Sequence, residues 1–223
     1  MIALVRFQIE GYLRSLRVLY PLIAVLALTT LVLAQPPSSS TLAFAALGDT
    51  VAFLVPLWAW TSRSLLNTQP PVQEALSSLA VRRHSEAGLL AAYLVNLVLG
   101  AVLFALPLSH ALTLALPPSA LLLVLALTVL ACASATLLGA WTSRAVIPSP
   151  SISALTLLAL LIVGLVLDLT PAAWLSLPVI TWDSAAHRGP STFRDAFPGL
   201  ALHLVLWTIP VAAAYHLKTR RPR

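Results

Sequence analysis

The sequence has few charged residues and almost no cysteine or lysine. Of its 223 residues only 9% are charged, one is a cysteine, and Lys218 is the single lysine. One cysteine excludes an internal disulfide and a cysteine-cluster metal site, and Cys132 lies within an apolar run, as a small buried hydrophobe would. A P-loop requires a Gly-x-x-x-x-Gly-Lys-Ser/Thr motif, which the surroundings of Lys218 do not supply. Any ATP that energises this protein must therefore be hydrolysed by another chain.

Motifs of membrane enzymes are also missing from the sequence. The apolar run 86–108 contains no His-x-x-x-His or Glu-x-x-His pair, the five histidines are scattered, and no Gly-x-Ser-x-Gly elbow occurs. We therefore predict that the chain is not an enzyme. We expect no catalytic, cofactor-binding or metal-binding residues in it.

Apolar residues are what the sequence has in excess. They make up 59% of the chain, and the mean hydropathy is +0.94. This composition predicts an all-α polytopic membrane protein. A net charge of +6 would suggest nucleic acid as the partner of a soluble protein, but here the basic residues fall between apolar runs and act as topology signals. We expect membrane lipids as partners, and no nucleic acid.

The apolar runs predict one transmembrane domain over residues 1–223. Its six expected spans are 18–34, 42–66, 86–108, 119–142, 152–167 and 200–217. Residues 1–17 have apolar side chains on one helical side and Arg6, Glu10 and Arg14 on the other, which predicts an interfacial helix in the membrane plane.

The segment 171–198 is too interrupted by polar residues to span a membrane and too apolar to be a free loop. Irregular backbone at membrane depth must be covered by protein or face water. We expect two short half-helices there, forming a re-entrant outer hairpin between the fifth and sixth spans.

The basic residues predict the orientation of the chain. If the N-terminus is inside, the cytoplasmic side holds 11 of the 13 Lys and Arg residues. They are Arg6, Arg14, Arg17, Arg63, Arg82, Arg83, Arg144, Lys218, Arg220, Arg221 and Arg223. Only Arg188 and Arg194 would be outside. Because cytoplasmic loops carry the excess of positive charge, we predict that both termini are cytoplasmic and that the number of spans is even.

The polar segment 70–84 between the second and third spans reads as a short cytoplasmic helix. Its apolar residues recur at helical spacing, at Val72, Ala75, Leu76, Leu79 and Ala80. Two environments remain open for this apolar stripe. The helix could lie on anionic lipid head groups, with Arg82 and Arg83 contributing, or it could insert into a groove of a protein partner. The weakly charged face, which includes Glu74, favours the protein groove.

A few polar residues within or beside the spans are candidate functional residues. Asp49 either lines a pathway or an oligomer interface, or caps the second span at its start, and we favour capping slightly. Asn96 could touch a substrate, but a hydrogen bond between helices is the more common use of such an amide. The outer residues Trp182, Asp183, His187 and Arg188 could form a gate. The alternatives are that Trp182 anchors the membrane boundary and that the charged residues belong to a solvated hairpin.

The arrangement resembles the membrane subunit of an ABC-2 type (type V) ABC transporter. The matching features are the interfacial helix 2–16, six spans with both ends inside, the helix-bearing loop 70–84 and the outer hairpin 171–198. They cover essentially the whole chain, and each is a match of topology without a residue signature.

The resemblance implies a permease of an ATP-driven exporter in a bacterial inner membrane. Two such membrane subunits, identical or paired with a similar paralogue, would surround a pathway, and ABC ATPase subunits carrying ATP and Mg would bind below. The segment 72–83 would be the coupling helix, with contacts from Val72, Glu74, Leu76, Leu79, Arg82 and Arg83. The alternative is a non-transporting membrane anchor or assembly subunit that recruits a soluble partner through the same loop.

Overall fold

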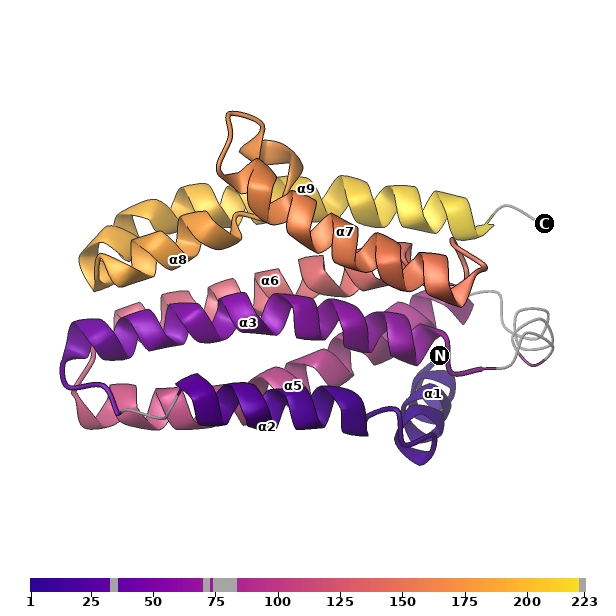
Figure 1. The fold of residues 1–223 in the computed structure, drawn as a ribbon, viewed down its shortest axis with the longest axis horizontal. Coiled ribbons are helices and arrows are strands. Elements are labelled where there is room, and N and C mark those ends of the chain that lie inside the picture. Colours follow the sequence, from indigo (N-terminus) through magenta and orange to yellow (C-terminus); the bar gives the residue numbers. More distant parts are fainter. Residues whose placement is uncertain (33–35, 70–72, 74–83, 221–223) are drawn as a thin grey trace.

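The structure is a computed structural model that describes residues 1–32, 36–69, 73 and 84–220 (Figure 1). The described secondary structure is helical and contains no strand. Its elements are α1 (Ile2–Arg14), α2 (Leu19–Val32), α3 (Ser40–Leu66), α5 (His84–Thr113), α6 (Pro118–Trp141), α7 (Pro150–Asp168), the 3-10 turn η1 (Ala173–Leu175), α8 (Val179–His187) and α9 (Pro190–Arg220).

Five described helices are long and apolar enough to cross a membrane, namely α3, α5, α6, α7 and α9. This confirms the expected polytopic α-helical class. Helix α1 and the segment Leu19–Leu28 of α2 join at an angle of 68°. Taken together as one bent span, they are also long and apolar enough to cross a membrane. A sixth span through α2 therefore stays a prediction.

Two helices extend beyond the spans that the sequence predicts, because prolines do not end these helices. The third span was expected to end by residue 108, but α5 continues through Pro107 to Thr113. The sixth was expected to start at residue 200, but α9 begins at Pro190 and continues through Pro198. Within an apolar bundle a helix can tolerate the loss of the backbone hydrogen bond that proline cannot donate.

The expected outer hairpin 171–198 is correspondingly different. Its first part is η1 followed by the nine-residue helix α8, as the half-helix interpretation anticipated. Its second half-helix does not exist as a separate element, because those residues form the first turns of α9. The segment is therefore one short helix packed beside the start of a long one.

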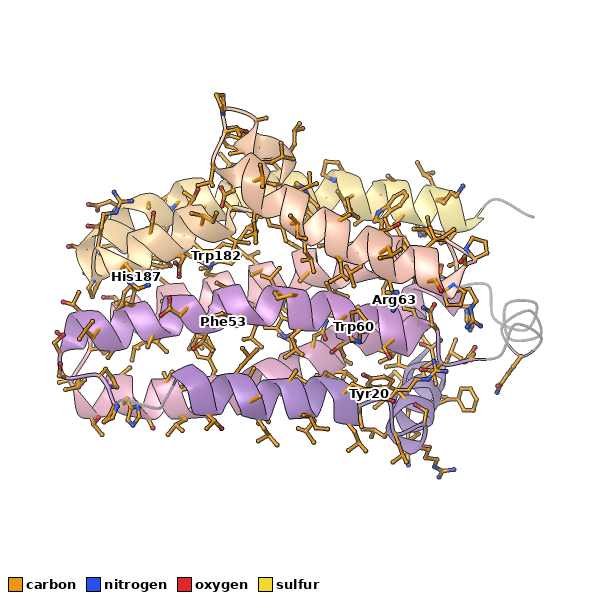
Figure 2. All side chains as sticks on the ribbon, in the orientation of Figure 1. Tyr20, Phe53, Trp60, Arg63, Trp182 and His187 are labelled. Carbon is orange, nitrogen blue, oxygen red and sulfur yellow. The ribbon has the colours of Figure 1, made fainter. Side chains whose placement is uncertain are left out.

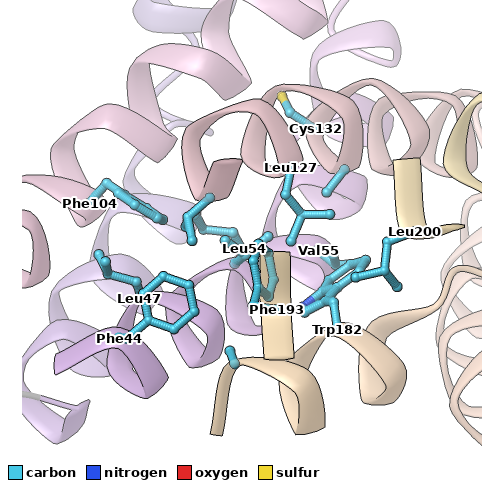
Figure 3. Close-up of a cluster of buried hydrophobic side chains, with 14 of the residues drawn as sticks. Phe44, Leu47, Leu54, Val55, Phe104, Leu127, Cys132, Trp182, Phe193 and Leu200 are labelled. Carbon is cyan, nitrogen blue, oxygen red and sulfur yellow. The ribbon is translucent and has the colours of Figure 1, made fainter. Parts of the chain in front are cut away.

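Helix α3 is the centre of the molecule. In its most apolar 18-residue window 67% of the residues are buried, against 11% for α7 and 17% for α9. It packs against α2, α5, α6 and α8, and the core contains Phe44, Leu54, Leu127, Trp182 and Phe193 (Figure 3). Glycines permit the closest approaches: a Cβ on Gly139 of α6 would collide with the Ala59 carbonyl of α3.

The bundle has two distinct ends (Figure 1). At the α1 end, α3, α6 and α9 terminate, and α5 and α7 begin. At the α8 end, α3, α6 and α9 begin, and α5 and α8 terminate. The gate candidates on α8 lie toward one end, and the end of α3 and the start of α5, which flank the segment 70–84, lie at the other.

Candidate functional site

Two carboxylates and an imidazole meet at the α8 end. The Nε2 atom of His187 lies 2.8 Å from Oδ1 of Asp49 and 3.9 Å from Oδ2 of Asp183. One ligand atom from each of the three residues lies within 4.8 Å of the others. Figure 2 shows His187 at this end of the bundle. We call Asp49, Asp183 and His187 the α8-end cluster.

Helix α3 brings Asp49 to this cluster from within its own length. The helix begins at Ser40, and the side chain of Ser39 accepts a hydrogen bond from the Leu42 amide at 3.2 Å. The interpretation of Asp49 as the cap of this span is therefore wrong, since Ser39 has that role ten residues earlier. A Cβ on the adjacent Gly48 would lie 2.5 Å from Cβ of Ala186, so the missing side chain lets α8 approach closely.

Asp168, at the end of α7, fixes the start of α8. Its Oδ2 accepts the backbone N–H groups of Ile180 at 2.6 Å and Thr181 at 3.2 Å, and its Oδ1 accepts the Thr181 hydroxyl at 2.8 Å. A carboxylate at a helix N-terminus satisfies amides that have no partner within the helix and complements the helix dipole. Only 8% of the surface of Asp168 is exposed.

The electrostatics of the cluster favour bound protons. Asp183 and His187 lie on α8, outside the candidate spans. Burial, followed by a hydrogen bond and charge repulsion from Asp49, raises the pKa of Asp183 to about 6. The hydrogen bond to Asp49 and the two negative charges raise the pKa of His187 above its ordinary 6.5. A protonated imidazole is therefore the group that lets two carboxylates lie this close.

The same atoms have a second chemical capacity. Two carboxylate oxygens and an imidazole nitrogen are ligands that bind divalent transition metals. In the present geometry, however, Nε2 of His187 is engaged with Asp49, so a cation would have to replace that hydrogen bond. A bound proton needs no such rearrangement.

The four expected gate residues do not share one environment. Asp183 and His187 are in the cluster, and Arg188 is exposed, with Nε donating to the Ser184 carbonyl at 3.2 Å. Trp182 is 0% exposed and belongs to the core beside Phe193 (Figure 3). The boundary-anchor interpretation of Trp182 is therefore wrong, and its side chain instead attaches α8 to the bundle.

Asn96 is a packing residue in this structure. It is fully buried, and its Nδ2 lies 2.8 Å from Oγ of Ser62 and 2.9 Å from Oγ1 of Thr136. Nδ2 also lies 3.1 Å from the backbone carbonyl oxygen of Trp58. Trp58 and Asp49 are nine residues apart on α3, which corresponds to about 13 Å at 1.5 Å per residue. Asn96 thus joins α3, α5 and α6 and is separate from the α8-end cluster.

At the α1 end, one asparagine connects three segments. Nη1 of Arg17 donates to the backbone carbonyl of Asn67 at 3.0 Å, and the amide of Arg144 donates to Oδ1 of Asn67 at 2.7 Å. The connection after α1, the end of α3 and the linker after α6 are therefore tied together.

The expected coupling residues Val72, Glu74, Leu76, Leu79, Arg82 and Arg83 lie outside the described residues. Comparisons with protein-family models, with curated proteins and with solved structures found no match to this chain. The function is therefore inferred from the residues and their geometry.

Sequence reasoning missed two residues that organise these ends, Asp168 and Asn67. Asp168 stands twelve residues before the amide it caps, and Asn67 accepts from residues 50 and 77 positions away. No local pattern signals such partners. The only available sign was a single polar residue at the end of each apolar run.

Proposed function

We propose that this chain is the membrane subunit of an exporter energised by separate ATPase subunits, as its resemblance to ABC-2 type permeases implies. Two membrane subunits, identical or similar, form the pathway in a bacterial inner membrane, with both termini cytoplasmic. ATP and Mg are bound by the partner ATPases. The observation that carries the proposal is the convergence of Arg17, Asn67 and Arg144 at the α1 end.

This convergence supports a platform for a partner. Asn67 lies three residues before the segment 70–84, and Nε2 of His84, where α5 begins, lies 3.2 Å from Oε1 of Gln69. The ends of the segment are therefore close together, while α1 and the linker after α6 lie beside its base. A force applied to such a loop passes directly into α3, α5 and α6.

Helix α3 provides the connection from the platform to the other end. Asp49 and Asn67 are 18 residues apart, which corresponds to about 27 Å along a helix. That distance is close to the hydrocarbon thickness of a bilayer, about 30 Å. In the proposed mechanism a displacement of α3 by the ATPases moves Asp49 relative to α8.

The gate in this mechanism is α8. It is held to α7 by the Asp168 cap and to α3 by the α8-end cluster. A shift of α3 relative to α7 strains one of these attachments. Asp183, His187 and Arg188 then lie at the opening, and Trp182 is the apolar anchor about which α8 turns.

The experiment is co-purification of the chain with the products of its neighbouring genes, followed by measurement of ATP hydrolysis in lipid nanodiscs. The test variant combines Leu76→Asp, Arg82→Glu and Arg83→Glu. Burying charge in an apolar contact costs several kcal/mol, so we expect ATPase association to fall by about tenfold or more.

The matched control is Lys218→Glu with Arg220→Glu, two charge reversals at the end of α9 on the same side. It should assemble and hydrolyse ATP as the unmodified protein does. A triple variant that keeps an assembled and stimulated ATPase would contradict the coupling assignment. An unmodified chain that co-purifies with a soluble partner lacking ATPase activity would favour the anchor alternative.

A further inference from the structure

An apolar groove of about 500 Å³ lies between α2 and α3. Its lining includes Tyr20, Ala24 and Leu28 from α2 and Phe53, Pro56 and Trp60 from α3. Figure 2 shows Tyr20, Phe53 and Trp60 between these two helices, with Arg63 beside Trp60. The groove is open to its surroundings, because Tyr20, Phe53 and Trp60 are exposed.

The length of the groove is close to the thickness of one leaflet. From Tyr20 to Leu28 is eight residues, or about 12 Å along a helix. Half of the hydrocarbon core of a bilayer is about 15 Å. The two polar-tipped aromatic residues, Tyr20 and Trp60, are at the α1 end of the groove, where interfacial aromatic residues belong. Toward the middle of the bundle the lining is apolar.

A fixed positive charge lies at the same end. The Cζ atom of Arg63 lies 5.3 Å from the centroid of the Trp60 ring. Its Nε donates to Oγ of Ser153 at 2.6 Å and its Nη2 to the Pro150 carbonyl at 2.7 Å. Among the described residues Nη1 has no acceptor, so one edge of a guanidinium that α7 holds in place is available. Arginine in this arrangement matches the geometry of phosphate oxygens.

A second guanidinium belongs to the connection just before α2. Arg17 precedes α2 by two residues, and its Nη1 donates to the Asn67 carbonyl beyond the end of α3. Arg17 and Arg63 thus stand where α2 begins and α3 ends. An occupant with an anionic head and an apolar tail is complementary to both parts of the site.

The charged end of the groove decides between a neighbouring helix and a lipid as its occupant. An apolar helix would cover the lining but would leave the free edge of the Arg63 guanidinium without an anion. A single hydrocarbon chain is far narrower and fits within the available volume. We propose that the groove binds one acyl chain of an anionic phospholipid from the surrounding bilayer, with its phosphate at the free edge of the Arg63 guanidinium beside Trp60.

The test is native mass spectrometry of the delipidated full chain in detergent, titrated with dioleoyl-phosphatidylglycerol or dioleoyl-phosphatidylcholine. Phosphatidylglycerol should bind with a preference of about fivefold, because one basic residue near an anionic lipid contributes roughly that factor. Arg63→Gln should remove most of this preference, and Arg63→Lys should keep more of it. This comparison of head groups uses the unmodified protein first, so it does not depend on a variant folding.

The tail site is tested by filling it with Leu28→Trp, which should weaken phosphatidylglycerol binding by about tenfold. Leu26→Trp is the matched control, because Leu26 is 57% exposed on the same helix and is not part of the lining. Equal binding of both lipids by the unmodified protein would overturn the proposal. A Leu28→Trp variant that binds lipid normally would also overturn it. If Leu28→Trp converted a dimer to a monomer without changing lipid binding, the occupant would be a second copy of this chain and the proposal would be wrong.

Discussion

At the scale of single residues, Asn96 shows how a polar group is accommodated inside an apolar bundle. Its amide lies against acceptors on α3 and α6, and the indole N–H of Trp58 donates back to the Asn96 carbonyl at 2.8 Å. The backbone and side chain of one residue therefore join three helices. An amide can donate only two hydrogen bonds at once, so its three neighbours share them.

Replacing Asn96 by leucine should lower the free energy of unfolding by about 1 kcal/mol, because a hydrogen bond between membrane helices contributes about that much. The measurement is unfolding in detergent followed by circular dichroism. Thr30→Val is the control, since the Thr30 hydroxyl is exposed and donates only within its own helix, to the Leu26 carbonyl. Unchanged stability together with altered transport would instead assign Asn96 to the pathway.

At the scale of elements, α8 is a short helix held mostly by its ends and one side chain. Asp168 caps its start, Trp182 packs into the core, and His187 pairs with Asp49 at its end. The attachment at the end of α8 depends on pH, because Asp183 and His187 both bind protons more tightly in the folded state.

Docking of α8 should therefore weaken as pH rises. A raised folded pKa means that the protonated group stabilises the fold. The contribution of Asp183 is complete below its ordinary value of 3.8 and is lost as pH rises through about 6. That of His187 is complete below 6.5 and is lost as pH rises through its higher folded value. The charged groups that act on this pair are Asp49 on α3 and the two residues themselves. The other charged residues of the connected segments are Arg188 after α8 and Arg194 and Asp195 in the first turns of α9.

Hydrogen exchange of the α8 amides, corrected for intrinsic rates and measured in EDTA, tests this expectation. Protection should fall between about pH 5 and pH 8. Asp49→Asn should remove most of the dependence above pH 6, because it removes the partner of His187. Asp195→Asn neutralises another carboxylate at the same end and should leave the dependence in place. Protection that does not change with pH would show that the cluster does not hold α8.

At the scale of the whole molecule, basic residues are concentrated at one end. The α1 end carries Arg14, Arg17, Arg63 and Arg144 together with the end of α9, whereas the α8 end carries Arg188, Arg194 and the α8-end cluster. The basic residues that the positive-inside rule counts along the chain thus lie mostly at one end of the structure. This agreement supports the proposed orientation without depending on the number of spans.

Single-cysteine labelling can test the orientation. In a Cys132→Ser background, Arg188→Cys should react with a membrane-impermeant maleimide on intact cells, because Arg188 is exposed at the α8 end. Lys218→Cys is the matched position at the α1 end and should react only after permeabilisation. The reverse pattern would invert the topology and contradict a cytoplasmic ATPase platform.

The sequence by itself determined the class of the protein, the long apolar helices and the difference in charge between the ends. Composition and periodicity are local properties, and in a bilayer they decide which segments can be helices at all. It did not show that α5 continues to Thr113 or that α9 already begins at Pro190, because Pro107 and Pro198 stop a helix in water but not inside an apolar bundle.

Only the tertiary structure decided which polar residues act together. Asp49 and His187 are 138 positions apart, and Asp168 and Asn67 bind partners that no spacing rule connects. The sequence also did not show that Asn96 lies away from the α8-end cluster. The physical reason is that close approach at glycines such as Gly48, and burial beside them, selects the partner of each polar side chain.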